Sequence, residues 1–447
     1  MVLFVNRVTH REGRRAVSSP RATEAYPLVH RKEHNAEETA LRHSNATVFT
    51  NRATKWKSLF TRSAPDCEQP QFMNIQRLIL RDFRNLHACD LELTEGVHIL
   101  CGENGQGKTN LLESIYILSN LSSFRSAHLK DLILYGATYG RILGRIRSGG
   151  VQKELMVFIR EGGKIVKVNG HAVGRGVDYF GEFAALLFSP DSLKWVQGGP
   201  EFRRRFMDTA ISRIDRNYLL QLKEYKRVLY QRNRLLRLIH ESKAPRETLK
   251  AWNEQLVQTG SRILEKRLDY LRDLAPVLRE VFKAFFQKAA EIRIQYHSSW
   301  FRIPKLNGAM ADLSVWTGRF RQGIEQKEDE EVRQRTGLIG PHLDDLDFLV
   351  DGRPLKPGSS RGEMRMFAIS LTLSEAKLYR NKKRRFPVLL LDDVTSELDR
   401  KRQEILCKQI ESLGQVFLTT TDDSFVGKMK SCARIFQVQK GEIILVT

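Results

Sequence analysis

The chain has 447 residues, of which 74 are Lys or Arg and 52 are Asp or Glu, so its formal net charge is +22. That length suggests two or three domains. With 41% apolar residues the chain can build a core, which excludes wholesale disorder. It contains no apolar stretch long enough to span a bilayer, so we expect a cytoplasmic protein without a membrane partner. The five cysteines form no CxxC pair, which argues against structural zinc and a disulfide scaffold. The positive excess predicts a polyanionic partner such as nucleic acid.

Residues 1–72 spread their apolar side chains thinly among charged ones. Such a composition cannot bury enough apolar surface to offset the entropy of the chain, so it predicts a disordered extension. Met73 then opens the segment 74–80, whose alternating apolar residues predict a first strand. Met73 is therefore also a candidate for the true start of translation.

The remainder is predicted to be an α/β head interrupted by helices. Strands are predicted at 97–101, 140–146, 154–160 and 164–168, with a helix at 110–119. After residue 200 the apolar residues recur at helical spacing, with breaks expected near Pro245 and Pro276. The segment 322–335 is charged and predicts an exposed loop or helix. We therefore expect four parts: an extension (1–72), the first part of the head (73–200), a helical lobe (201–305) and the second part of the head (306–447).

Residues 102–109 match the phosphate-loop pattern GxxxxGK[ST] between a predicted strand and a predicted helix. The glycines allow main-chain N–H groups to surround a phosphate chain. Lys108 places a cation on the β- and γ-phosphates, and Thr109 offers an oxygen to Mg²⁺. The predicted nucleotide-binding residues are Gly102, Glu103, Asn104, Gly105, Gln106, Gly107, Lys108, Thr109 and Asn110.

The apolar run 387–391 ends in two acids, Asp392 and Asp393. A continuous apolar run is typical of a parallel strand that is buried on both faces, and α/β sheets bind ligands at the carboxyl ends of such strands. We therefore assign Asp392, with Thr109, to a Mg²⁺ site and Asp393 to polarising the attacking water. The alternative is a solvated acidic turn.

A second helix start lies at Ser360, Gly362 and Glu363, ahead of an apolar helix. A serine cap followed by glycine can bind an anion, although alone it is better explained as an ordinary helix cap. Further along the chain come the segment 396–399 (Ser-Glu-Leu-Asp) and a strand at 416–418 that is followed by Thr419 to Asp422.

This order of motifs resembles that of ABC-type ATPases: phosphate loop, signature serine, acidic strand, Ser-x-Leu-Asp loop and switch strand. With a short helical insertion, it resembles the bacterial RecF family of recombination and repair proteins over about residues 73–447. The resemblance implies an α/β fold in which a P-loop ABC-type ATPase head carries an inserted helical lobe. It is carried by residues 81–85, 198–200, Arg203, Arg204, Phe206, Asp208, 252–256, 340–342, Asp345, Leu346 and 391–399.

The resemblance implies an ATP-dependent homodimer that uses ATP and Mg²⁺. Lys108 and Thr109 of one subunit would face Ser360 and Gly362 of the other across two shared nucleotides. It also implies a task, which is to bind DNA at single-strand gaps or double-strand/single-strand junctions and to help RecR and RecO load RecA recombinase. The residues implied near the base, in the loop crossing between subunits and at the switch position are Arg84, Asn85, Asp399 and Thr421.

Three positions depart from the family pattern or bear on the rate of ATP hydrolysis. Leu343 follows Gly-Pro-His, where a basic residue is usual, and Glu363 replaces the commoner Gln of the signature. Asp393 stands where many transporter relatives have Glu. Its side chain is one methylene shorter, which predicts slow, switch-like hydrolysis. The expected enzyme is a weak ATPase stimulated by DNA.

Basic clusters are the candidate DNA contacts. The sequence shows no helix-turn-helix beside them, so they would recognise the charge of the DNA backbone rather than the bases. Alternatively, each cluster could simply form the solvent-exposed face of an amphipathic helix. Residues 203–205 could also form ion pairs with Asp208 and nearby acids. The candidates are Arg203, Arg204, Arg205, Arg232, Arg234, Arg237, Lys382, Lys383, Arg384 and Arg385.

Three other functions compete with this one. The first is an ABC-type ATPase subunit of another machine, such as a transporter, which the helical lobe and the basic charge disfavour. The second is a scaffold that holds nucleotide without hydrolysing it, against which Asp393 argues. The third is a nuclease-linked ATPase, but the acids Asp344, Asp345 and Asp347 more simply bracket a strand. His342 is either catalytic or a structural hydrogen-bonding residue.

Overall fold

The structure is a computed structural model that describes residues 71–286, 291–301, 303, 312–355, 359–396 and 398–446. All of them belong to one compact unit, 69–447. The extension predicted for residues 1–72 lies outside these residues except at its end. Strand β1 runs from Gln71 to Phe83, so it begins three residues before the predicted segment 74–80 and ends three residues after it. Phe72 pairs with Phe386 in the sheet and stacks on its ring at 5.1 Å, a partner that only the fold supplies.

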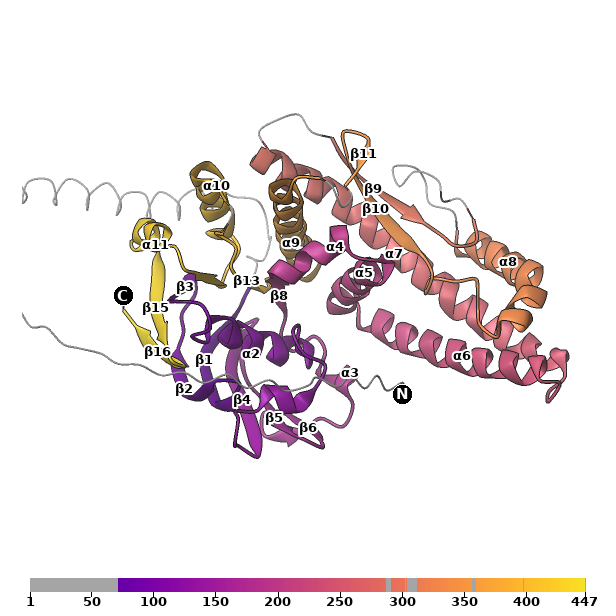
Figure 1. Cartoon of the computed structure of the whole chain (residues 1–447), viewed down its shortest axis with the longest axis horizontal. Helices are drawn as coiled ribbons and strands as arrows, with labels where there is room; N and C mark the ends of the chain where they lie inside the picture. The colour runs from indigo at the N-terminus through magenta and orange to yellow at the C-terminus, as the bar shows by residue number, and fades with distance from the viewer. Residues whose placement is uncertain are drawn as a thin grey trace, which may run out of the picture. The chain divides into compact units, whose positions relative to one another are not determined.

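A six-stranded sheet forms the centre of the head, in the order β16-β15-β3-β14-β13-β8 (Figure 1). All neighbours are parallel except the edge strand β16. The middle strands β3, β13 and β14 are wholly buried, as their continuous apolar sequences predict. The strands are β3 (Val97–Cys101), β8 (Ala185–Phe188), β13 (Val388–Leu391), β14 (Val416–Thr420), β15 (Ala433–Gln439) and β16 (Glu442–Leu445).

Helices cover both faces of this sheet. Leu100, Leu390 and Phe417 share a core with helix α2 (Lys108–Asn120). The alternate residues of the same strands, such as Ile99 and Leu389, share another core with α9 (Arg361–Lys383) and α10 (Arg400–Ile410). Because successive side chains of a strand point to opposite faces, the parallel strands are sandwiched between helices. The short helix α11 (Asp423–Met429) belongs to the second core.

A second, mainly antiparallel sheet packs over α2, in the order β12-β1-β4-β5-β6-β7 with β2 beside β1. The three antiparallel strands predicted within 140–168 are confirmed, although each begins one to three residues earlier. The remaining strands and linking helices are β2 (Leu86–Glu92), β4 (Tyr139–Ser148), β5 (Val151–Arg160), β6 (Gly163–Val168), β7 (His171–Ala172), β12 (Arg385–Phe386), α3 (Gly176–Tyr179) and α4 (Lys194–Gln197).

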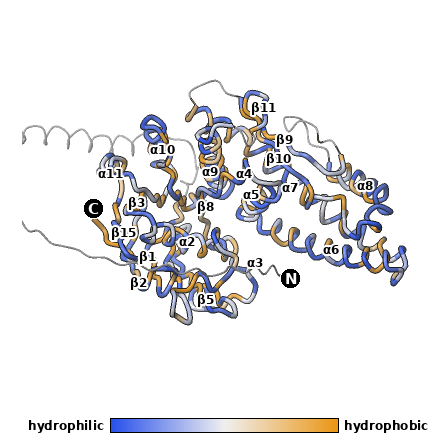
Figure 2. The backbone as a smooth tube through the Cα atoms, in the orientation of Figure 1, coloured by the Kyte–Doolittle hydropathy of each residue, from blue (hydrophilic) through white to orange (hydrophobic). Residues whose placement is uncertain are grey.

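Long helices follow residue 200, as the helical spacing predicts. They are α5 (Pro200–Ile214), α6 (Arg216–His240), α7 (Leu249–Phe286) and α8 (Leu313–Gln334). The charged segment 322–335 is thus largely helical. Along α6 hydrophobic and hydrophilic residues interleave (Figure 2). Its buried stripe includes Tyr218, Leu222, Tyr225, Val228, Arg232, Leu236 and Ile239.

The helix end predicted at Pro276 is wrong, because α7 continues through this residue. A proline inside a helix removes one hydrogen bond and costs about 3 kcal/mol. On either side of it Leu274, Leu278 and Phe282 are fully buried. Burial of each such side chain contributes about 1.5–3 kcal/mol, so packing outweighs the local preference.

The sequence analysis missed strand β9 (Ile292–His297). It pairs with β10 (Asp345–Val350), which in turn pairs with β11 (Arg353–Pro354). The core around α6 and α7 includes β9 and β10, and it extends beyond residue 305 into Phe320 of α8. The boundaries proposed for the helical lobe remain a prediction. Among the described residues, no helix is long and apolar enough to cross a membrane.

Candidate nucleotide site

The phosphate loop lies between β3 and α2, as predicted, and two of its glycines are required by the backbone. Gly102 has a φ of 141°, and a Cβ there would lie 2.3 Å from the carbonyl oxygen of Val438. Gly107 has a φ of 120°, and its Cβ would lie 3.0 Å from Oδ1 of Asn85. A larger side chain is therefore blocked by the backbone at Gly102 and strained at Gly107, whose φ other residues rarely adopt.

Lys108 and Thr109 open α2, where the helix N-terminus favours an anion. The ammonium group of Lys108 donates to the carbonyl oxygens of Gly102 (2.5 Å) and Glu103 (2.7 Å). Burial lowers the pKa of Lys108, while the nearby Asp393 and Asp392 oppose that shift. Lys108 is only 8% exposed. A cation largely withdrawn from water beside main-chain N–H groups is suited to bind phosphate oxygens.

The predicted magnesium pair is in contact. The hydroxyl of Thr109 donates to Oδ1 of Asp392 at 2.8 Å, and Thr419 donates to the same oxygen at 2.8 Å. Burial raises the pKa of Asp392, with the neighbouring Asp393 adding to the effect. An acceptor-rich, buried carboxylate beside a hydroxyl fits Mg²⁺, which prefers one or two protein oxygens completed by phosphate and water. No cluster of three or more His, Cys, Asp or Glu side chains suited to a metal occurs in the described part of the chain.

A cavity of about 210 Å³ brings these groups together. Gln106 belongs to the loop but faces elsewhere, because its side chain accepts a hydrogen bond from the main chain of Lys440. Gly102 and Glu103 line no part of the cavity and contact Lys108 instead. The residues that line it are Asn104, Gly105, Gly107, Lys108, Thr109, Asn110, Arg125, Asp392, Asp393, Thr419 and Thr421.

Asp393 is held in the left-handed region of the backbone, at a φ of 50°. Its N–H donates to Thr419 Oγ1 at 2.8 Å, and Ser396 Oγ donates to its carboxylate at 2.8 Å. Arg365 of α9 donates to the main-chain carbonyl of Asp393 and to Ser396 Oγ. The loop that carries the proposed water-polarising acid is therefore tied to the helix that Ser360 begins.

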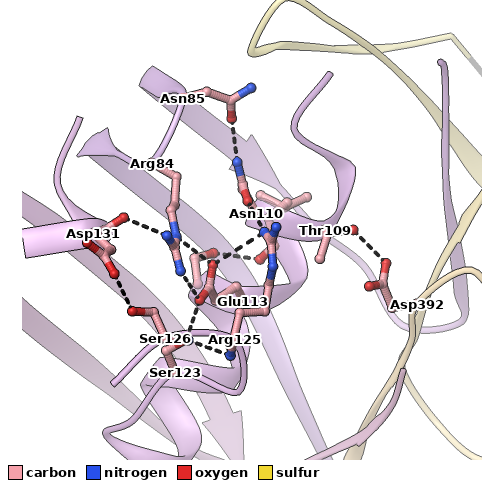
Figure 3. Close-up of polar contacts among 12 residues, drawn as sticks. Arg84, Asn85, Thr109, Asn110, Glu113, Ser123, Arg125, Ser126, Asp131 and Asp392 are labelled. Carbon is pink, nitrogen blue, oxygen red and sulfur yellow. Dashed lines mark hydrogen bonds and ion pairs between the residues drawn. The ribbon is translucent and has the colours of Figure 1, made fainter. Parts of the chain in front are cut away.

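Arg84 and Asn85 occupy different environments (Figure 3). Arg84 makes a two-pronged ion pair with Glu113, at 2.9 and 2.7 Å, and donates to the carbonyl of Asp131 at 2.6 Å. The Glu113 side chain is fully buried, so Arg84 neutralises a charge in the interior. Asn85 instead donates to main-chain oxygens of the phosphate loop and accepts from Asn110 at 2.7 Å. Neither Arg84 nor Asn85 lines the cavity.

The sequence analysis missed Arg125 and Glu113. Arg125 lines the cavity, donates to Asn110 Oδ1 at 2.7 Å and lies 4.0 Å from Glu113. Ser123 also donates to Glu113 (Figure 3). No motif spacing marks Arg125, because a loop after α2 brings it back to the phosphate site. A Glu within the apolar face of α2 was the one available signal for Glu113.

The second helix start is an N-cap, as predicted. Ser360 Oγ accepts from the N–H of Glu363 at 3.1 Å, so the serine caps α9. Neither Ser360 nor Gly362 lines the phosphate cavity of its own chain. Asp399 caps α10 by accepting from the N–H of Arg402 at 2.8 Å.

One candidate DNA contact is wrong. Arg232 is fully buried, where it donates to Glu331 at 2.5 Å and to Asn253 at 2.6 Å, so it cannot reach a ligand in solution. Arg232 lies in the buried stripe of α6, whereas Arg234 and Arg237 lie on the solvent-exposed face of the same helix. The candidates that are exposed are Arg205, Arg234, Arg237, Lys382, Lys383 and Arg384, while Arg203, Arg204 and Arg385 are half-buried.

Residues 203–208 follow the ion-pair alternative in part. Arg203 pairs with Asp345 at 2.7 and 2.9 Å. Arg204 donates to the carbonyl of Asp344 at 2.7 Å and makes no ion pair with a carboxylate among the described residues. Asp208 pairs instead with Arg267, at 2.8 Å.

The acids and the histidine near residue 342 have structural partners. Asp344 accepts from Tyr296 at 2.6 Å, and burial raises its pKa to about 6. The hydroxyl oxygen of Tyr225 lies 2.6 Å from Nδ1 of His342, and burial lowers the pKa of His342 to about 4. These contacts favour the structural reading of both residues.

A phosphate loop, a buried acidic strand beside it, a capped second helix and helices inserted into the α/β fold define an ATPase head of the ABC type. The sequence family described as RecF/RecN/SMC N terminal domain matches residues 74–444. The chain is 36% identical over 375 residues to the DNA replication and repair protein RecF of Heliobacterium modesticaldum, covering 83% of this chain and 99% of that protein. It is 32% identical over 375 residues to RecF of Geotalea daltonii, covering 83% and 100%. The chain belongs to the RecF family of DNA replication and repair proteins.

Two solved structures of the recombination mediator protein RecF in the RecFOR pathway, described as RecF-ATPrS and RecF-ATP, are also similar. Each has a TM-score of 0.76 and 30% sequence identity, and covers 85% or 84% of this chain and 100% of its own. The fold class expected from the sequence, an ABC-type ATPase head, is confirmed.

Proposed function

We propose that the chain is an ATP-switched DNA-binding protein of recombinational repair that acts in the cytoplasm. The observation that carries the proposal is that Lys108, Thr109, Asp392 and Asp393 surround one cavity in a chain of the RecF family. The family relatives named above, described as DNA replication and repair proteins and as RecF-ATP, support both DNA and ATP as ligands.

Each group at the cavity has a role that follows from its chemistry. Lys108 and the loop N–H groups bind the β- and γ-phosphates. Thr109 and Asp392 would hold Mg²⁺, which neutralises charge on the phosphates when bound. Asp393 orients and polarises the attacking water. Arg125, a cation on the same cavity, contacts the phosphates. Asn85 orders the loop from outside.

Two copies of the chain close on the nucleotide in this proposal. Ser360 and Gly362 begin a capped helix that lines no part of the nucleotide cavity of its own chain, so its N-terminus suits a phosphate held by a second copy. Each γ-phosphate then links a phosphate loop to the α9 of the other subunit. Hydrolysis removes the link, so ATP times both the dimer and its hold on DNA.

The DNA would be a single-strand gap or a double-strand/single-strand junction, contacted through exposed basic side chains such as Arg205, Arg234 and Lys383. Recognition would rest on phosphate charge, so affinity should fall steeply with salt. RecO and RecR are the expected mediators and RecA the recombinase, which the RecFOR description of the similar structures supports. Hydrolysis is slow and stimulated by DNA.

The test measures the mass of the full chain by light scattering, and its binding to a fluorescent junction DNA, with and without ATP and Mg²⁺. We expect monomers without nucleotide, and dimers that bind DNA with it. Lys108→Met should abolish both, whereas Lys130→Met, at an exposed position, should not. A dimer insensitive to nucleotide, or ATP that is bound but never hydrolysed, would instead favour the scaffold function.

A further inference from the structure

A cavity of about 480 Å³ lies among α5, α6, α7 and the residue that follows α3. It shares no lining residue with the nucleotide site. Its volume lies in the range of about 300–1,000 Å³ in which proteins hold small organic ligands. It therefore requires an explanation separate from ATP.

One wall of this cavity is apolar. Phe180, Leu219, Leu222 and Ile263 contribute to the lining. Phe180 is only half-buried, and its ring makes no contact with another aromatic ring in the described part of the chain. Phe180 thus contributes a partly accessible aromatic ring, with its planar face, to the lining. Such a face can stack on a nucleobase, whatever the identity of the base.

The other wall is basic. Arg204, Arg205 and Lys226 line it, against one acid, Glu201, that lacks an ion pair among the described residues. Asp208 also lines the cavity, but Arg267 neutralises it. Arg205 and Lys226 are exposed and make no hydrogen bond or ion pair within the described ranges. Two cations that have no partner among the described residues favour an anionic ligand.

The positive charge continues beyond the cavity. A smaller hollow of about 250 Å³ shares Phe180 and Ser212 with it. Lys383 and Arg385, from the far end of α9 and β12, line that hollow. A chain of phosphates leaving the first cavity would therefore meet further cations, as an extended strand of DNA requires and a single small anion does not.

We propose that the cavity binds one unpaired nucleotide of a DNA strand, with its base on Phe180 and the leucines and its phosphate on Arg205 and Lys226. This inference rests on the proposed function, that the chain binds DNA. A base within a duplex is paired and stacked, so it cannot enter, whereas a base at a gap or junction is free to do so. The cavity would thereby supply a preference for junctions, because contacts to backbone phosphates do not read whether a base is paired, whereas a base-binding cavity does.

The experiment uses the full chain with ATP and Mg²⁺ and compares blunt duplex with duplex carrying a single-stranded tail. Phe180→Ala should weaken binding of the tailed DNA about tenfold, at the low end of base–aromatic stacking, and leave the blunt duplex unchanged. Lys226→Glu should weaken binding of the tailed DNA at least about threefold more than Lys223→Glu does. Lys223 is exposed on the same helix but lies outside the cavity, so Lys223→Glu is a control with the same change of charge. Tyr230→Ala, an exposed aromatic outside the cavity, controls for Phe180→Ala.

A 2-aminopurine base moved along the tail adds a direct readout, because its fluorescence should change on binding at one position and return in Phe180→Ala. Equal weakening of blunt and tailed DNA, or no effect of either cavity variant, would overturn the inference while leaving the proposed function in place. Variants that bind tailed DNA normally but lose a mediator protein would overturn it too, since the cavity would then hold an acidic peptide. Absence of DNA binding by the unaltered protein would mark failure of the proposed function itself.

Discussion

Arg365, five residues into the helix that Ser360 caps, donates hydrogen bonds to the main-chain carbonyl of Asp393 and to Ser396 Oγ, the latter at 2.8 Å. Ser396 donates in turn to the carboxylate of Asp393. The helix expected to meet the other subunit's γ-phosphate is thus bonded to the acid loop of its own subunit. Arg365 is only 4% exposed, so water cannot easily substitute for it.

Arg365→Lys should therefore lower kcat for ATP more than it changes KM. Both bonds come from Nη2 at the tip of the guanidinium. Lys has no planar guanidinium to carry a donor to that point, so Asp393 would be held in the wrong place while the phosphate loop stays intact. We expect kcat to fall about 10- to 100-fold, with KM within about threefold. Steady-state kinetics measure both. Arg380→Lys, at the distant end of the same helix, is the control, and equal effects in the two variants would contradict the role.

Removal of Arg84 should destabilise the protein because it leaves the buried carboxylate of Glu113 with a charge that Arg125, exposed and 4.0 Å away, compensates poorly. Breaking such a pair costs about 3–5 kcal/mol. Urea unfolding of Arg84→Ala should show a loss of this order, and Glu113→Gln added to it should recover part. Arg77→Ala breaks an exposed pair with Asp90 and should cost less than about 1 kcal/mol. Similar losses of unfolding free energy in Arg84→Ala and Arg77→Ala would contradict the difference expected between a buried and an exposed ion pair.

Arg232 and Arg234 are near neighbours on α6 with opposite expected effects. Arg232→Ala should lower stability by about 3–5 kcal/mol, since Glu331 would remain buried without its partner. Arg234→Ala should leave stability within about 0.5 kcal/mol. It should weaken DNA binding and make the salt dependence shallower by about one phosphate contact. Thermal unfolding and salt titrations of DNA binding distinguish them, and a folded Arg232→Ala with selectively lost DNA binding would restore Arg232 as a contact.

His98 predicts acid sensitivity. It is buried in β3 against Phe417, and burial lowers its pKa to about 4. Since its folded pKa lies below the usual 6.5, the unfolded chain binds the proton first, and stability falls as the pH drops from about 6.5 toward 4. The loss at pH 5 is about 2 kcal/mol. Between pH 7 and 5, His98→Phe should lose less stability than the unaltered protein.

The control for that measurement is His171→Phe, at an exposed position of the short strand β7. It should keep the full pH dependence of urea unfolding. Each variant is compared with itself at the two pH values, so a packing defect from the substitution cancels. If His98→Phe keeps the whole pH dependence, the sensitivity arises elsewhere, for example at His342.

Sequence patterns predict well what chain neighbours determine. The phosphate loop, the buried strand before Asp392 and the cap at Ser360 each follow from a short run of residues. Pro276 and Arg232 could not be predicted in this way, because tertiary packing overrides the local preference of the first and a distant Glu331 neutralises the second. Strand β9 was missed because its partner β10 lies far along the chain.

The site shows the same limit. Lys108 and Thr109 lie within one motif, and the fold brings Asp392 to them in the way its buried strand predicts. Arg125 reaches the cavity through a loop whose conformation depends on the buried Glu113. The spacing of residues in the sequence therefore does not predict that Arg125 lies at the cavity.

The most direct measurement is cross-linking between subunits. Asn104→Cys, on the phosphate cavity, and Ser360→Cys are placed on differently tagged copies in which Cys67, Cys407 and Cys432 are replaced by Ser. With ATP and Mg²⁺ we predict an intersubunit disulfide that is absent without nucleotide and lost again in Lys108→Met. Cross-linking that ignores nucleotide, or none at all when ATP is demonstrably bound, would contradict the account.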